Sequence, residues 1–73
     1  MSINSLNFGE KGIIQNIEGN SKLVKRLCAL GCIEGTEVQL KRTAPLGDPV
    51  IINVRGFDLA IRKRDAESIK IVK

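Results

Sequence analysis

The feature that most restricts the fold is the segment from Val50 to Ile61, in which two apolar runs flank Arg55–Gly56. A two-residue turn at Arg55–Gly56 would bring the two runs side by side as a β-hairpin. The facing pairs would be Val54 with Phe57, Ile52 with Leu59, and Val50 with Ile61. All of these side chains are apolar and share one face, so a one-residue slip would move them to the other face. The pattern therefore predicts a hairpin with a well-specified register and one buried face.

Three further stretches have the pattern of a strand. Residues 36–42 alternate between apolar and polar side chains, which is typical of a half-buried strand. Isoleucine-rich stretches at 13–17 and 69–71 indicate one strand before the hairpin and a short last strand after it. A turn, or a single helical turn, is expected at 65–67.

One short helix is predicted between the first two strands. Asn20 or Ser21 is a good N-cap, and Gly31 is a typical C-terminal stop. The apolar residues of this helix fall on one stripe that we expect to face the core, namely Leu23, Val24, Leu27, Cys28 and Leu30. Lys22, Lys25 and Arg26 should point toward water, and they form one of two candidate docking faces.

The length of 73 residues allows one domain, near the lower size limit for a self-supporting core. A small antiparallel sheet with one apolar face is arranged most economically as a closed barrel, because closure removes the sheet edges. The sequence therefore predicts a mainly β protein with a single domain over residues 1–73. Its expected architecture is a small SH3-like barrel of about five antiparallel strands with one short inserted helix.

The loop at 43–49 precedes the hairpin and has an unusual composition. Pro45 and Pro49 stiffen it, and Gly47–Asp48 is typical of a turn. A simple turn explains most of these residues. It does not explain Leu46, because a leucine at a rigid tip is either folded back onto the barrel or offered to a partner.

Five cations are expected to gather at the end of the barrel that carries this loop, with Asp48 near them. They are Lys41, Arg42, Arg62, Lys63 and Arg64. The simplest interpretation is a solvated basic rim. The functional interpretation is a docking surface for an acidic partner, made of this rim, Leu46, Asp48 and an exposed apolar position such as Ile51.

The composition argues against several kinds of chemistry. The chain has no histidine, the commonest general base and metal ligand, and it has no phosphate-binding loop motif. Its two phenylalanines are fewer aromatics than the stacking platforms of single-strand binders require. Cys28 and Cys32 lack the additional ligands of a zinc site, so we expect core thiols, with redox sensitivity as a less favoured alternative. We predict no catalysis, no cofactor and no metal site.

The charge and the ends of the chain limit its location and partners. A net charge of +4 permits a nucleic acid, an anionic lipid surface or an acidic protein as partner. We see no signal peptide and no apolar run long enough to span a membrane. We therefore expect a cytoplasmic protein without direct membrane insertion, and its small core leaves room for weak self-association.

Motifs along nearly the whole chain are together similar to the FeoA family of bacterial ferrous-iron uptake systems. The motifs are R-L-x-x-L-G at 26–31, G-x-x-V at 35–38, A-P-L-G-D-P at 44–49, R-G at 55–56, and L-A-I-R at 59–62, followed by the turn at 66–67. The resemblance covers residues 5–72. Cys28 and Cys32 stand where other apolar or small residues would serve, so no cysteine-based function is implied.

This resemblance implies an SH3-like barrel, a module that is also similar to the C-terminal domain of DtxR-type iron-dependent repressors. It implies an accessory role for the protein, with the membrane transporter FeoB as the partner, through either its cytosolic G-protein domain or its membrane portion. It also implies an association with transition metals, although the sequence shows no ligand set for a tight site. The alternatives are a basic barrel that binds nucleic acid, which we do not expect, and a stand-alone metal-sensing domain.

Overall fold

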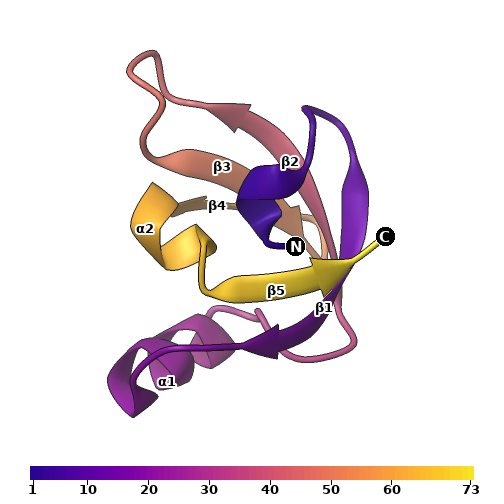
Figure 1. Cartoon of the computed structure of the whole chain (residues 1–73). Helices are drawn as coiled ribbons and strands as arrows, with labels where there is room; N and C mark the ends of the chain where they lie inside the picture. The colour runs from indigo at the N-terminus through magenta and orange to yellow at the C-terminus, as the bar shows by residue number, and fades with distance from the viewer.

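A computed structural model describes the whole chain, residues 1–73, and shows five antiparallel strands in one curled sheet (Figure 1). The strand order is β4-β3-β2-β1-β5. The strands are β1 (Lys11–Ile17), β2 (Glu37–Thr43), β3 (Val50–Val54), β4 (Phe57–Ile61) and β5 (Ile69–Val72). The helical elements are η1 (Ile3–Ser5), α1 (Ser21–Ala29) and α2 (Lys63–Ala66). The mainly β architecture with one short helix inserted after the first strand is thus confirmed.

The β3–β4 hairpin has the register that the sequence predicts. Val54 pairs with Phe57 and Val50 pairs with Ile61 across the turn. Arg55 and Gly56 have φ angles of 54° and 86°, as a tight two-residue hairpin turn requires. The prediction that Phe57 lies on the buried face is wrong, since this side chain is 72% exposed. Its partner Val54 is buried in the core, so only the β3 side of this last pair is covered.

The two end strands of the sheet, β4 and β5, do not pair with each other; α2 connects them, and the N-terminal segment lines β5. Ser2 forms a β-bridge with Lys70, and the Ile71 N–H donates to the Met1 carbonyl oxygen at 2.9 Å. The Asn4 amide nitrogen donates to the Lys63 carbonyl oxygen at 2.9 Å, which attaches η1 to α2. The sequence did not predict η1, which helps to complete the barrel.

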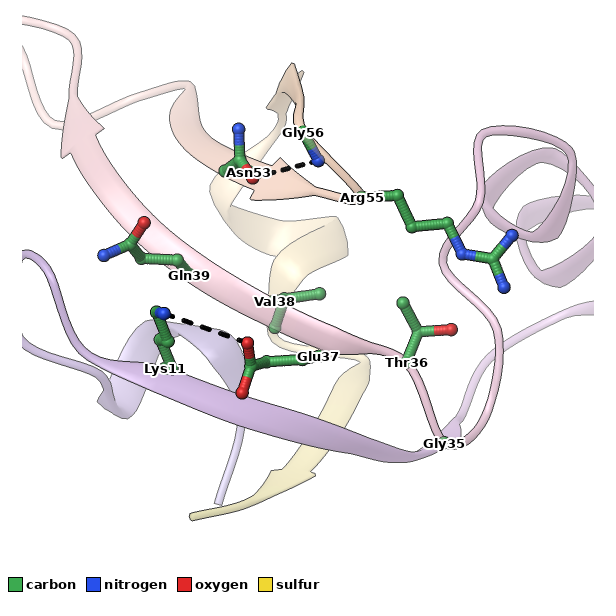
Figure 2. Close-up of a pocket in the computed structure, with 9 residues that line it drawn as sticks. All are labelled: Lys11, Gly35, Thr36, Glu37, Val38, Gln39, Asn53, Arg55 and Gly56. Carbon is green, nitrogen blue, oxygen red and sulfur yellow. Dashed lines mark hydrogen bonds and ion pairs between the residues drawn. The ribbon is translucent and has the colours of Figure 1, made fainter.

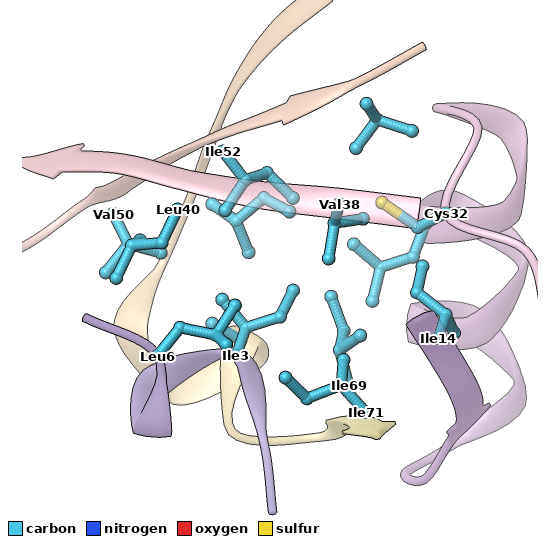
Figure 3. Close-up of a cluster of buried hydrophobic side chains, with 14 residues drawn as sticks. Ile3, Leu6, Ile14, Cys32, Val38, Leu40, Val50, Ile52, Ile69 and Ile71 are labelled. Atoms are coloured by element: carbon cyan, nitrogen blue, oxygen red, sulfur yellow. The ribbon is translucent and has the colours of Figure 1, made fainter. Parts of the chain in front are cut away.

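The core is a cluster of 14 buried apolar residues drawn from every strand (Figure 3). Helix α1 begins after Asn20, whose side chain caps the Leu23 N–H at 2.8 Å. Leu27 is its one fully buried residue. The prediction that Cys28 and Leu30 lie on the buried stripe is wrong, because both are exposed.

The geometry of the helix explains the exposure of Cys28. Successive residues of an α-helix are about 100° apart, so Cys28 points well away from the direction of Leu27. Within α1 only Leu27 is buried, while Leu23 and Val24 are half-buried. Cys32, which follows the helix, is fully buried instead.

Candidate docking surface

The β2–β3 loop, residues 44–49, is a defined turn with an apolar side chain at its tip. The Gly47 N–H donates to the Ala44 carbonyl oxygen at 2.7 Å, and the Ala44 N–H donates to the Pro49 carbonyl oxygen at 3.0 Å. Gly47 has a φ of 88°, which favours glycine. Leu46 is 96% exposed, so the alternative that it folds back on the barrel is wrong.

Asp48 connects this loop to α2. Its carboxylate oxygen Oδ1 accepts a hydrogen bond from the Lys63 N–H at 2.9 Å, at the first turn of α2. A carboxylate at this position satisfies a backbone donor that has no partner within the helix. Asp48 is one of the predicted docking residues, and in the structure it also forms a hydrogen bond between the loop and α2.

The five cations of the predicted rim are all exposed, and none of them takes part in an ion pair. They are Lys41, Arg42, Arg62, Lys63 and Arg64. Lys41 lies at an irregularity in the β2–β3 pairing, between Leu40 and Arg42. Exposed cations without ion-pair partners leave local positive charge on the surface. The predicted apolar position Ile51 is half-buried, so its exposure was overestimated.

The second predicted face, on α1, adjoins the rim. Lys22 and Lys25 are exposed, whereas the Arg26 guanidinium contacts the Asp65 carboxylate at 2.8 Å and joins α1 to α2. A depression of about 450 Å³ between the two helices is lined by Asn20, Lys22, Leu23, Arg26, Arg64 and Asp65. A neighbouring depression of about 220 Å³ is lined by Leu27, Leu30, Ala60, Ile61 and Arg62, again together with Arg26 and Asp65.

A further polar depression of about 390 Å³ lies over the outer face of β2 and the β3–β4 turn, and the sequence did not predict it (Figure 2). The Lys11 and Glu37 side chains form a loose ion pair of 3.9 Å on its wall. Arg55, which has no ion-pair partner, stands at its rim. The only sequence signal was the tight turn itself, because the lining residues come from segments that are far apart in the chain.

The titratable groups do not form a reactive centre. Burial raises the pKa of the Cys32 thiol, and the nearby Cys28 raises it further, so Cys32 remains protonated near neutral pH. The structure contains no group of three or more His, Cys, Asp or Glu side chains that could hold a metal ion. No helix of the protein has both the length and the apolar character needed to cross a membrane.

A small curled β sheet with a helical connection between its end strands defines an SH3-like domain, and comparison with known proteins agrees. The FeoA domain model matches residues 1–73, so the chain belongs to the FeoA family, which is associated with ferrous iron transport. It is 28% identical over 71 residues to an Fe(2+) transport protein A/Fe(2+) transporter FeoB fusion protein of Porphyromonas gingivalis. The match covers 97% of this chain and 8% of the length of the fusion protein.

Solved structures share the fold. A FeoA protein of Chlorobium tepidum has 30% identity and a TM-score of 0.92, covering 99% of this chain and 69% of that one. A zinc complex of FeoA from Stenotrophomonas maltophilia is described as an SH3 domain protein. It has 23% identity and a TM-score of 0.83, and the match covers 97% of this chain and 88% of that one. IdeR of T. acidophilum has 22% identity and a TM-score of 0.84, and the match covers 99% of this chain and 33% of that one. The predicted family and fold are therefore confirmed, including the similarity to iron-dependent repressors.

Proposed function

We propose that this protein is a cytoplasmic, non-catalytic accessory protein that docks on the cytosolic face of a FeoB-type Fe(II) transporter and assists or regulates it. The observation that carries the proposal is the P. gingivalis fusion protein, in which a region similar to this whole chain is joined to FeoB. Covalent joining of two modules raises their effective concentration, which is useful when the modules act together. This chain would reach the same arrangement by non-covalent docking.

The docking surface in this proposal is the loop end of the barrel. Leu46 is an apolar anchor held on a stiff turn, and burial of a leucine contributes about 1.5–3 kcal/mol. Because the loop is already ordered by its own hydrogen bonds, little conformational entropy is lost on binding. The basic rim and the half-buried Ile51 complete the surface, with the rim acting mainly on orientation and association rate.

The proposal is tested by titration of the protein against the isolated cytosolic domain of its cognate FeoB, run without nucleotide, with GDP and with a GTP analogue. We expect binding, and we expect the double variant Leu46→Ala with Arg62→Glu to weaken it at least about tenfold. The matched control is Phe57→Ala with Arg55→Glu, which removes one exposed apolar side chain and reverses one unpaired arginine at the opposite end of β3. Equal affinity of the two variants would remove the loop end from consideration, and absence of binding in all nucleotide states would contradict the proposal.

A further inference from the structure

Two adjoining depressions share Arg26 and Asp65 in their linings: the larger lies between α1 and α2, and the smaller lies between α1, Leu30 and the end of β4. Together they are called the groove, and the Arg26–Asp65 ion pair lies where its two halves meet. The Asp65 side chain is only 15% exposed, so its charge is largely covered by the contact with Arg26. In Figure 1, α1, α2 and the β2–β3 loop lie on the same side of the molecule.

The two halves of the groove differ in chemistry. The larger half carries Lys22 and Arg64 on its walls, and Arg62 borders the smaller half. None of these three cations has an ion-pair partner within the chain. The smaller half has an apolar surface that includes Ala60 and Leu30, which is 48% exposed.

We infer that this groove binds an extended acidic peptide segment that also carries an aliphatic side chain. The acidic side chains would meet Lys22, Arg62 and Arg64, and the aliphatic one would lie on Leu30 and Ala60. The Arg26–Asp65 pair already connects the two helices in the free protein. The inference rests on the proposed function in one respect: it takes the cytosolic part of the transporter as the source of the segment.

Charge and shape together favour a peptide over a lipid surface. The unpaired cations are complementary to carboxylates, and they line a concave surface between two helices rather than a convex one. A planar array of headgroups cannot follow such a groove, whereas an extended chain can lie along it. The apolar half also offers a place for one side chain, which adds specificity to an otherwise electrostatic contact.

The test uses the full chain with Lys22→Glu and Leu30→Ala, one change in each half of the groove and both outside the loop end. The control is again Arg55→Glu with Phe57→Ala, which makes the same change in charge and also truncates one exposed apolar residue. Two probes are titrated: the cytosolic domain of FeoB, and a fluorescein-labelled synthetic peptide with a run of glutamates followed by one leucine. Thermal unfolding of each variant verifies that it is folded, and the amide signals of Leu30 and Ala60 report the site of binding.

We expect the groove variant to lose about tenfold in affinity for both probes, with the control close to the parent protein. If the FeoB domain binds the groove variant as tightly as the control, the inference is wrong and the proposed function stands. If the FeoB domain binds in no state while the peptide binds in the groove, the acidic ligand class stands and the proposed function fails. If the peptide does not bind, the inference is overturned. Binding to phosphatidylglycerol vesicles that the groove variant abolishes would then assign the cations to a membrane surface.

Discussion

The loop before β3 and the turn after it are stabilised by different kinds of contact, although each connection has one exposed apolar side chain beside it. The turn at Arg55–Gly56 is held by local contacts, including the Gly56 N–H donating to the Asn53 side-chain oxygen at 3.3 Å. The loop at the other end has turn hydrogen bonds of its own and, in addition, a contact across the molecule, from Asp48 to the first turn of α2. Local contacts can be recognised in a short stretch of sequence, whereas the position of Leu46 depends on an element that follows later in the chain.

The largest expected effect on stability belongs to the local turn. Gly56 has a positive φ of 86°, which a β-branched residue strongly disfavours. We expect Gly56→Val to lower the free energy of unfolding by about 2 kcal/mol. Urea denaturation measures this, and Gly56→Asn is the control, since asparagine tolerates this conformation better. Equal losses for the two variants would mean that backbone conformation is not the cause.

Loss of the hydrogen bond between Asp48 and the Lys63 N–H should lower the free energy of unfolding by less than Gly56→Val does. Asp48→Ala removes the acceptor of the Lys63 N–H, and we expect a loss of about 1 kcal/mol in the free energy of unfolding. Hydrogen exchange at the Lys63 amide should become faster, and Asp48→Asn should retain most of the protection. Unchanged exchange at Lys63 in Asp48→Ala would show that the contact does not hold the loop.

The local side-chain contact at the turn should be weaker still. Asn53 accepts from the Gly56 N–H at 3.3 Å and donates to the Asp58 carboxylate at 2.9 Å, both near the surface. We expect Asn53→Ala to lower the free energy of unfolding by about 0.5 kcal/mol, because water replaces exposed hydrogen bonds. The same urea denaturation measures this. A larger loss in Asn53→Ala than in Asp48→Ala would mean that the turn contact stabilises the protein more than the loop contact does.

The smallest effects on stability are expected at the two exposed apolar residues. Leu46 is 96% exposed and Phe57 is 72% exposed, so neither side chain is covered in the isolated protein. We expect Leu46→Ala and Phe57→Ala each to change the free energy of unfolding by no more than about 0.5 kcal/mol. Thermal unfolding of both variants tests this, and a clear destabilisation by Leu46→Ala would indicate that the leucine packs on the barrel.

The elements that the sequence predicted are those defined by neighbouring residues. The hairpin register follows from the apolar pairs on either side of Arg55–Gly56, and the start of α1 follows from Asn20 as N-cap. The segment η1 had no such signal, because its partners lie in α2 and β5 at the other end of the chain. The exposure of Cys28 was missed because an apolar stripe does not show how wide an arc of the helix is covered.

The sequence singled out most residues of the candidate docking surface, but it did not show which of them lie together. The sequence identified Leu46, the five cations and the charged residues of α1. It could not show that Arg62 and Arg64 border the same groove as Lys22, because this depends on the Arg26–Asp65 contact between residues 39 positions apart. The polar depression beside Arg55 has the same origin in segments that are distant in sequence.

The Asp48 carboxylate has one more consequence, since it joins the loop tip to the helix that forms one wall of the groove. This hydrogen bond is a direct contact between the loop and the start of α2. We therefore expect binding at the tip and binding in the groove to be coupled through it. The test is a double-mutant cycle between Leu46→Ala and Lys22→Glu, measured on the free energy of binding. We expect its coupling energy to disappear when Asp48→Ala is also present.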